Sequence, residues 1–244
     1  HSYCKIQHGY IQLTALQSTP AIRAVDLSFA WPKQKPLYAN VSFELYPGEK
    51  FLITGPSGCG KSTLLNLLAG VVKPSAGEIW VLDRNIQTLS QTATDQLRGE
   101  QMGFIFQQFN LLPYLSVRDN ILLPAHLFAK RKAAALAQFG SLDDALRYYM
   151  NHLGLSADLE NQAAHRLSIG QQQRVAAARA FMGSPSIVIA DEPTSSLDEG
   201  NQTQLLKLFF ALADEQQTAL LMVSHDPRLC SYFDRQLQLA EVSQ

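Results

Sequence analysis

The stretch GPSGCGKST, residues 55–63, combines three glycines with a lysine and two adjacent hydroxyl residues, and it lies between two apolar runs. Glycines let a loop curl so that successive backbone N–H groups point inward at phosphate oxygens, and a helix that follows adds its positive N-terminal dipole. Lys61 would reach the β and γ phosphates, Ser62 would bind Mg²⁺ through its hydroxyl, and Thr63 would add a phosphate contact. This spacing therefore favours the binding of a nucleoside triphosphate.

The predicted phosphate-binding set is the whole of this loop: Gly55, Pro56, Ser57, Gly58, Cys59, Gly60, Lys61, Ser62 and Thr63. Gly55, Gly60, Lys61 and Ser62 fit the fixed positions of the pattern G-x-x-x-x-G-K-[ST]. Cys59 stands at a variable position, where it is either a redox-sensitive thiol or, more simply, a small filler residue. The Lys61 side chain is expected to face solvent when no nucleotide is bound.

A second candidate site is SIVIADEPT, residues 186–194, in which two carboxylates follow four apolar residues. The run predicts a buried strand with Asp191 and Glu192 at its carboxyl end, where ligands bind in open α/β sheets. Asp191 is then placed to hold Mg²⁺ through water, and Glu192 to polarise the water that attacks the γ-phosphate. Adjacent acids also occur simply where a loop begins, and the phosphate loop upstream is what favours the catalytic interpretation.

The elements that must position these groups lie on either side of them. KFLIT, residues 50–54, predicts a strand before the phosphate loop, and STLLNLLAG, residues 62–70, predicts a helix after it. Short alternating apolar stretches from about residue 21 to 53 predict antiparallel strands. From about residue 108 to 165 the pattern is helical, and LLKLFFALA, residues 205–213, predicts a further helix before the strand TALLMVS, residues 218–224. The helical spacing is clearest for Leu142, Ala145, Leu146, Tyr149 and Leu153.

Composition limits the class of protein. The 244 residues carry a formal net charge of −1 with scattered basic residues, so a nucleic-acid partner is not expected, and the cluster KRK at 130–132 is typical of a solvated helix face. Three widely spaced cysteines predict a reducing compartment and no zinc site. No apolar run approaches the ~18 to 20 residues needed to span a bilayer, and the sequence predicts a cytoplasmic chain.

The segment LSIGQQQR, residues 167–174, resembles the signature of the ATP-binding cassette (ABC) ATPases, whose usual form is LSGGQ followed by a short polar run and an arginine. The resemblance covers nearly the whole chain from about Ala21. In order, it includes the phosphate loop, a glutamine in GFIFQQFN (103–110), the signature, the carboxylate strand, SSLD (195–198) and a histidine in LLMVSHD (220–226). These motifs identify the chain as a member of that family, which implies an ATPase with ATP and Mg²⁺ as its ligands.

The resemblance also implies a dimer. Ser168, Gly170 and Gln171 would form a second anion site at the start of the helix QQQRVAAARAFM, facing the γ-phosphate bound to another copy of the chain. Two chains would then lie head to tail and enclose two ATP molecules, with Asp198 linking the two sites across the interface. Ile169 stands where the family usually has glycine, and we expect it to weaken dimer closure without abolishing it.

Within each site, the family assigns roles to three further side chains. Gln107 would sense the γ-phosphate and help to hold the metal, and His225 would contact the γ-phosphate and hold the attacking water together with Glu192. The adenine, which the family usually stacks on a tyrosine, would stack here on Trp31. Phe29 is the alternative, and either ring could instead pack in the core.

The expected fold is α/β: a P-loop NTPase (RecA-like) core with an antiparallel β subdomain and an α-helical subdomain. Residues 1–244 would form a single ABC nucleotide-binding domain. Its core and β subdomain would take up about 21–106 and 166–240, and its helical subdomain about 107–165.

Residues 102–127, MGFIFQQFNLLPYLSVRDNILLPAHL, are most similar to the ATPases of the lipoprotein-release, macrolide-efflux and cell-division group, although SSLD departs from the TGNLD common there. The implied partners are transmembrane permease subunits, which would hold the chain at the inner face of the cell membrane. Leu111, Leu112 and Leu115 would receive a short cytoplasmic helix of the permease, or belong to the subdomain core.

Two other classes of function remain to be weighed. A soluble, non-transport ABC ATPase of DNA repair would carry a long coiled coil, and one of translation would carry two cassettes; neither feature is present. A P-loop kinase or GTPase would lack the signature. The favoured interpretation is therefore a subunit that powers a membrane complex through ATP-driven dimer closure.

Overall fold

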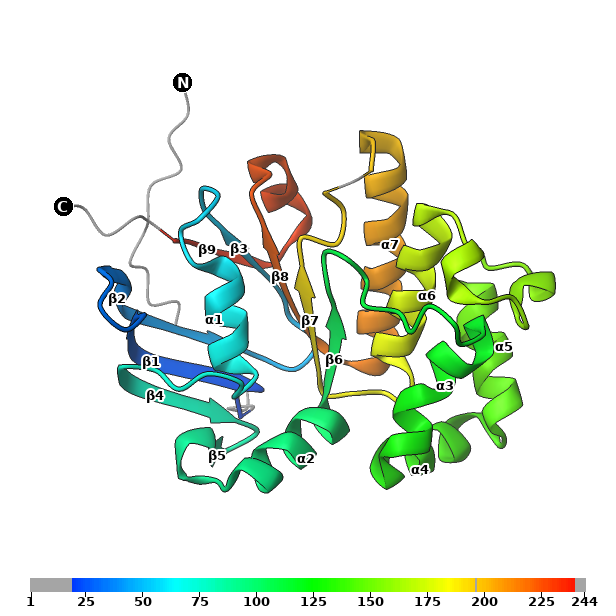
Figure 1. The fold of residues 1–244 in the computed structure, drawn as a ribbon, viewed down its shortest axis with the longest axis horizontal. Helices are drawn as coiled ribbons and strands as arrows, with labels where there is room; N and C mark the ends of the chain where they lie inside the picture. Colours follow the sequence, from blue (N-terminus) through cyan, green and yellow to red (C-terminus); the bar gives the residue numbers. More distant parts are fainter. Residues whose placement is uncertain (1–18, 196, 240–244) are drawn as a thin grey trace, which may run out of the picture.

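A parallel sheet forms the centre of the molecule in the computed structural model, which describes residues 19–195 and 197–239 (Figure 1). Its strand order is β6-β7-β8-β3-β9, and neighbouring strands in it run parallel. The bounds are β3 Lys50–Thr54, β6 Met102–Ile105, β7 Ile187–Asp191, β8 Ala219–Ser224 and β9 Arg235–Gln238. Strands β7 and β8 are almost continuously apolar because helices or the second sheet cover both of their faces.

The second sheet is antiparallel, with the order β2-β1-β4-β5. Its strands are β1 Ile22–Ala30, β2 Pro36–Leu45, β4 Ala76–Val81 and β5 Arg84–Asn85. Helix α1, Lys61–Leu68, contacts both β4 and β7 and therefore lies between the two sheets (Figure 1). A hydrophobic cluster that includes Leu27, Leu64 and Val223 joins the antiparallel sheet, α1 and the parallel sheet.

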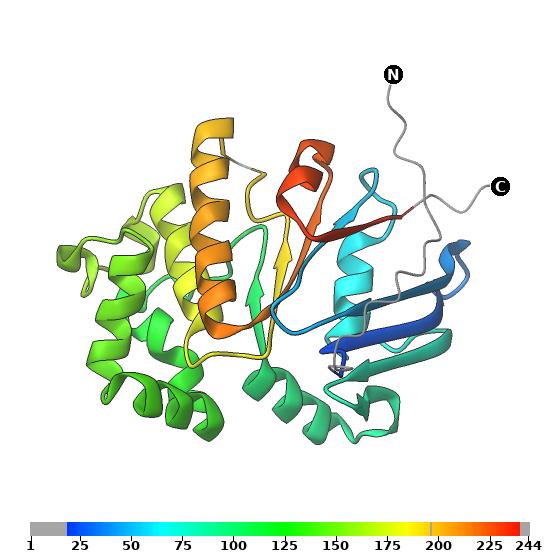
Figure 2. The ribbon, with the colours of Figure 1, turned by 180° about the vertical axis from the view of Figure 1, so that it is seen from behind.

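The remaining helices gather beyond β6 (Figure 2). They are α3 Val117–Leu127, α4 Ala129–Phe139, α5 Leu142–His152 and α6 Ile169–Phe181, while α2 Gln91–Gln101 leads into β6 and α7 Glu199–Gln216 leads toward β8. Short 3₁₀ turns occupy Ile86–Thr88, Ala157–Leu159, Ala164–Arg166 and Pro227–Tyr232. Tyr149, Val175 and Phe181 are fully buried in the core that these helices share with the parallel sheet.

Helix starts follow from the sequence. Ser90, Ser116, Ser141, Ser168 and Asp198 are N-caps whose side-chain oxygens accept a backbone N–H in the first turn of α2, α3, α5, α6 and α7. One glycine is required by a close approach: a Cβ added at Gly103 in β6 would lie 2.1 Å from the Ala180 carbonyl oxygen in α6. The absence of that side chain lets α6 pack directly against the sheet.

The predicted fold class is confirmed, with its three parts in the expected order. KFLIT is β3, and the helix predicted over 205–213 is longer, because the Asp198 cap starts it at Glu199. The helical pattern predicted from about residue 108 is wrong at its start: residues 106–116 are irregular, and α3 begins only at Val117. Phe109 and Asn110 there have φ of +60° and +45°, which no helix allows. The domain boundaries themselves stay a prediction.

No helix within 19–195 or 197–239 combines the length and the apolar character that crossing a membrane requires.

Candidate functional site

The candidate site lies at one edge of the parallel sheet, where β3, β6, β7 and β8 all end. The phosphate loop follows β3, Gln107 follows β6, Glu192 follows β7 and His225 follows β8. Since neighbouring parallel strands end at the same edge, the strand order brings together side chains that are far apart in sequence.

The phosphate loop runs from Gly55 to Gly60 and enters α1 without a side-chain cap. Gly58 and Gly60 have φ of +85° and +96°, a backbone conformation that favours glycine. Pro56 and Ser57 are exposed, and Ser62 is exposed in the first turn of α1. The free N–H groups at the start of α1 can therefore receive an anion. Cys59 is 3% exposed and packs in the core, as a filler residue would.

The expectation that the Lys61 side chain faces solvent is wrong. Lys61 is 6% exposed, and its ammonium donates to the carbonyl oxygens of Gly55 at 2.8 Å and Pro56 at 3.0 Å. The same nitrogen lies 3.6 Å from Oε1 of Glu192. The curl of the loop turns two carbonyls inward, and they satisfy the cation in place of water.

Asp191 closes β7 and accepts a hydrogen bond from the hydroxyl of Ser62. Burial raises the pKa of the Asp191 carboxyl, a shift opposed by the Ser62 hydrogen bond and by the charge of Lys61. A carboxylate and a hydroxyl in contact supply the kind of oxygen ligands that Mg²⁺ takes when phosphates and water complete its coordination.

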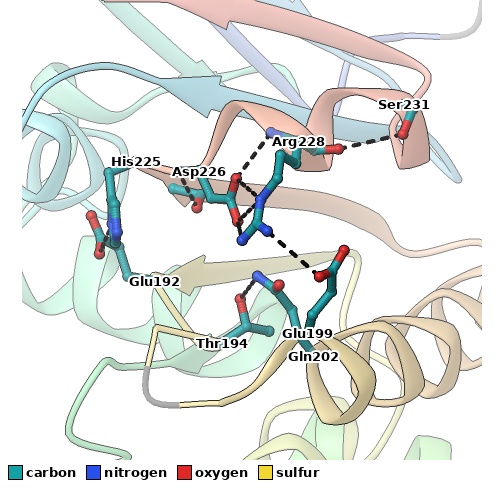
Figure 3. Close-up of polar contacts among 9 residues, drawn as sticks. Glu192, Thr194, Glu199, Gln202, His225, Asp226, Arg228 and Ser231 are labelled. Carbon is teal, nitrogen blue, oxygen red and sulfur yellow. Dashed lines mark hydrogen bonds and ion pairs between the residues drawn. The ribbon is translucent and has the colours of Figure 1, made fainter.

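Glu192 and His225 form the closest pair of titratable side chains in the site. Nδ1 of His225 lies 2.7 Å from Oε2 of Glu192. Figure 3 shows the two side chains facing each other. The Glu192 side chain is 15% exposed and that of His225 is 52% exposed. Glu192 has φ of +44°, a strained value for a side chain of its size, and its N–H donates to the carbonyl of Val223 in β8 at 3.1 Å.

Gln107 lies exposed in the irregular segment after β6. That segment is anchored from α6, because Arg179 donates to the carbonyls of Phe109 at 2.7 Å and Asn110 at 2.8 Å. Gln107 is thus brought to the edge where the phosphate loop ends, although no hydrogen bond joins it to the other site residues in the described part of the chain.

The aromatic residues beside the loop have distinct environments. Phe29 is 5% exposed and belongs to the core, whereas Trp31 is 39% exposed and meets Phe29 edge to face with ring centroids 5.0 Å apart. Tyr38 packs against Phe29 and lies close to Gly60 of the loop. Trp31 therefore offers the accessible ring on this side of the phosphate loop.

The signature segment begins α6. Ser168 is its N-cap in a capping box: its hydroxyl accepts from the N–H of Gln171 at 3.3 Å, and its own N–H donates to Oε1 of Gln171 at 2.9 Å. Ile169 is 56% exposed, and nothing lies within 4 Å of a Cβ added at Gly170. The helix start is thus open to solvent in the single chain.

Asp198 is the N-cap of α7, accepts from the N–H of Asn201 at 3.0 Å and is exposed. The hydrogen bonds from Asn201 lower the pKa of the Asp198 carboxyl. The Asp198 carboxylate thus caps α7 and remains exposed to solvent on the side that faces away from the helix.

Sequence reasoning missed Gln202, which is 8% exposed in the first turn of α7 and donates to the hydroxyl of Thr194 at 3.0 Å (Figure 3). A signal was present: Gln202 shares its helical face with Leu205, Leu206 and Phe209, so its side chain falls on the buried side.

Sequence reasoning also missed a groove of about 660 Å³ that lies between α2, β6, α3 and α4. Its lining includes Phe104, Phe106, Leu127, Phe128 and Arg179. Of the leucines expected at this edge, Leu112 is 43% exposed, whereas Leu111 packs against the helical core.

A glycine-rich loop that leads from a parallel strand into a helix, with a carboxylate pair at the end of a nearby strand, defines a P-loop nucleoside triphosphatase. The family model described as ABC transporter matches residues 38–195. The chain belongs to the ABC transporter family and is its ATP-binding, ATP-hydrolysing type of subunit.

Similar proteins agree with this assignment. The chain is 39% identical over 206 residues to the lipoprotein-releasing system ATP-binding protein LolD of Hydrogenovibrio crunogenus, covering 84% of this chain and 86% of the relative. It is 38% identical to the putative hemin import ATP-binding protein HrtA of Staphylococcus haemolyticus, over 85% of this chain and 90% of that protein.

Among solved structures, the dimeric post-hydrolysis state of the ATP-binding cassette MJ0796 with ADP and Pi superposes with a TM-score of 0.76 at 28% identity, covering 89% of this chain and 94% of that one. The identity to LolD proteins confirms the predicted likeness to the lipoprotein-release group.

Proposed function

We propose that two copies of this chain close head to tail around two molecules of ATP with Mg²⁺, and that this closure drives a membrane complex of the lipoprotein-release type. The observation that carries the proposal is the grouping of Lys61, Glu192 and His225 at the mouth of the phosphate loop. The similarity to the MJ0796 cassette, which is dimeric in its post-hydrolysis state, supports the dimer.

Each residue of this group has a chemical task. Glu192 would accept the proton of the water that attacks the γ-phosphate, and His225 would hold its carboxylate and contact the same phosphate. Lys61 would exchange the carbonyls of Gly55 and Pro56 for phosphate oxygens. Its charge would thereby move away from the loop backbone and toward the transferred group.

The metal would be held by few protein groups. Ser62, Asp191 and Gln107 would hold Mg²⁺, and the contact between Ser62 and Asp191 supports the first two. Within the described residues no cluster of three or more His, Cys, Asp or Glu side chains could hold a metal, which suits an ion whose other ligands are phosphates and water. The bound ion would neutralise charge on the β and γ phosphates.

The second half of each site would come from the other copy. Ser168, Gly170 and Gln171 lie at the open start of α6, so their anion must be a phosphate that another chain holds. Asp198 would lie at the interface between the two sites. Trp31 would stack on the adenine.

The groove between α2, β6, α3 and α4 would receive a cytoplasmic helix of the transmembrane subunit. Leu127 is 64% exposed beside it and Phe106 is 38% exposed, so an apolar helix would cover surface that is costly to leave in water. Phe106 in the lining of the groove directly precedes Gln107. Gln107 would therefore couple the docking of this helix to the nucleotide site. The chain would thereby be held at the inner face of the membrane.

Glu192→Gln tests the proposal. The amide keeps the size of the side chain but cannot act as a base, so ATP turnover should fall at least about a hundredfold while ATP still binds. Glu78→Gln, on the exposed face of β4, removes a carboxylate outside the site and should leave turnover unchanged.

Sedimentation of the Glu192→Gln protein should reveal a monomer without nucleotide and a dimer with saturating ATP and Mg²⁺. A monomer at tens of micromolar protein in both conditions would overturn autonomous dimerisation, and turnover within a few fold of the parent would overturn the role of Glu192.

A further inference from the structure

Gln202 contacts both of the loops that carry the paired site residues. Its side-chain amide donates to the hydroxyl of Thr194 at 3.0 Å. The same side chain lies near enough to Asp226 to help lower the pKa of that carboxyl, after the larger effect of Arg228. Thr194 lies two positions after Glu192, and Asp226 directly follows His225. A buried amide in α7 is therefore bonded to the loop after β7, as Figure 3 shows, and lies beside the loop after β8.

The Asp226 end of this link is held firmly. Its N–H donates to the hydroxyl of Ser224 at 3.0 Å, and its carboxylate accepts from Arg228 through Nε at 3.0 Å, Nη2 at 2.8 Å and the backbone N–H at 3.0 Å. Arg228 also lies 3.7 Å from Glu199 in the first turn of α7. This ion pair joins the loop of His225 to the first turn of α7, where Gln202 also lies beside Asp226.

The Thr194 end of the link is buried. Thr194 is 3% exposed, and the turn that contains it is closed by the N–H of Ser195, which donates to the carbonyl of Glu192 at 3.2 Å. Because the backbone of Glu192 is strained, its orientation depends on such contacts in the residues that follow it. His225 has no comparable burial and depends on its loop for its position.

We propose that Gln202 is a positioning residue that sets the distance between Glu192 and His225, and that it transmits movement of the Asp198 interface to both of them. The inference rests on the proposed roles of these two residues in hydrolysis. Asp198 caps the helix whose first turn contains Gln202, so the two positions move as one rigid unit. Closure of a dimer at Asp198 would displace both loops together.

Gln202→Met tests this, because methionine matches the length of glutamine but cannot donate a hydrogen bond. We expect kcat for ATP hydrolysis to fall about tenfold, while KM and the directly measured Kd for ATP stay within twofold. Gln204→Met makes the same chemical change on the exposed side of α7 and should leave kcat, KM and Kd unchanged.

Gln202→Glu separates the two contacts of the amide. The glutamate can still accept a hydrogen bond from the Thr194 hydroxyl, but it repels the Asp226 carboxylate, so kcat should fall as far as in the methionine variant. If Gln202→Met fails to fold, the Gln202→Glu variant provides the test instead. A Gln202→Glu protein with parental kcat would overturn the link between the loops.

A double-mutant cycle distinguishes positioning from general stability. If Gln202 acts through His225, then Gln202→Met should lower kcat by less than twofold in a His225→Ala background. An equal tenfold loss in both backgrounds would overturn the proposal, since it would reveal an effect that does not pass through His225.

The failure of the inference and the failure of the proposed function give different results. If Glu192→Gln and His225→Ala both retain turnover, the proposed function is wrong. If both lose it while Gln202→Met retains parental kcat, only the positioning role is wrong.

Discussion

Replacing Lys61 by methionine tests how the phosphate loop is held before and after nucleotide binds. In the structure the ammonium is nearly buried, donates to the carbonyls of Gly55 and Pro56 and lies 3.6 Å from Glu192. Methionine removes the charge and both hydrogen bonds but retains much of the side-chain volume. The variant should therefore fold, because the stability lost with the two hydrogen bonds is offset by the desolvation cost that is no longer incurred for a buried ammonium.

The magnitude for nucleotide binding follows from the exchange of partners. With ATP bound, the ammonium would leave the two carbonyls for charged phosphate oxygens, and a hydrogen bond to a charged group contributes about 1.5–3 kcal/mol. At about 1.4 kcal/mol per factor of ten, the Kd for ATP should rise by about 10- to 150-fold. The thermal midpoint without nucleotide should move by only a few degrees.

Titration calorimetry with MgATP measures the affinity, and circular dichroism measures the fold and the midpoint. Lys50→Met is the matched control, because Lys50 is also largely buried and pairs with Asp214 at 2.5 Å at the opposite end of β3. A Lys61→Met protein whose Kd stays within threefold of the parent would refute the exchange of partners. An unfolded one would refute the argument that its buried contacts and buried charge cancel.

Gly103→Ala should destabilise the fold by about 3 kcal/mol in urea unfolding, because the new Cβ meets the Ala180 carbonyl at 2.1 Å; Gly170→Ala, with open space around it, should change stability far less. Arg228 lowers the pKa of the Asp226 carboxyl in the folded protein. The ionised carboxylate therefore stabilises the fold at pH values above its unfolded pKa, and this stability is lost as the pH falls through the lower folded pKa. Arg228→Gln should therefore move acid unfolding, followed by circular dichroism, to higher pH, and coincident curves would contradict this. Ile169→Gly in the Glu192→Gln protein should strengthen the ATP-bound dimer in sedimentation if the exposed side chain crowds the nucleotide, and an unchanged or weaker dimer would exclude such crowding.

The sequence was most informative where a short motif is bounded by a clear apolar run. KFLIT before the phosphate loop and SIVIA before Asp191 could be recognised as strands because buried parallel strands need continuous apolar residues. Because the carboxyl ends of parallel strands lie at the same edge of a sheet, the phosphate loop and Asp191 could then be placed at one edge. The pairing of Glu192 with His225 came instead from the family resemblance, since no local pattern connects residues in different loops.

What the sequence could not supply depends on the path of the backbone. The burial of Lys61 results from two loop carbonyls that turn inward, and no residue type specifies that direction. The irregular segment before α3 was hidden because its leucines imitate a helical pattern, while positive φ at Phe109 and Asn110 prevents a helix. Gln202 was overlooked because a glutamine near a helix start is usually exposed.

The three helix starts of the site differ in their cap residues, and the difference fits the separate tasks proposed for them. α1 begins at Gly60, which has no side chain to cap it, so its N–H groups remain for phosphate held by the same chain. α6 begins at Ser168, whose hydroxyl accepts a hydrogen bond from its own helix and still has its proton to donate outward. α7 begins at Asp198, whose negative charge suits a cap but would repel a phosphate. The residue type at each cap thus agrees with the proposed roles: α1 would bind this chain's ATP, α6 would complete the site of another chain, and α7 would lie between the two sites.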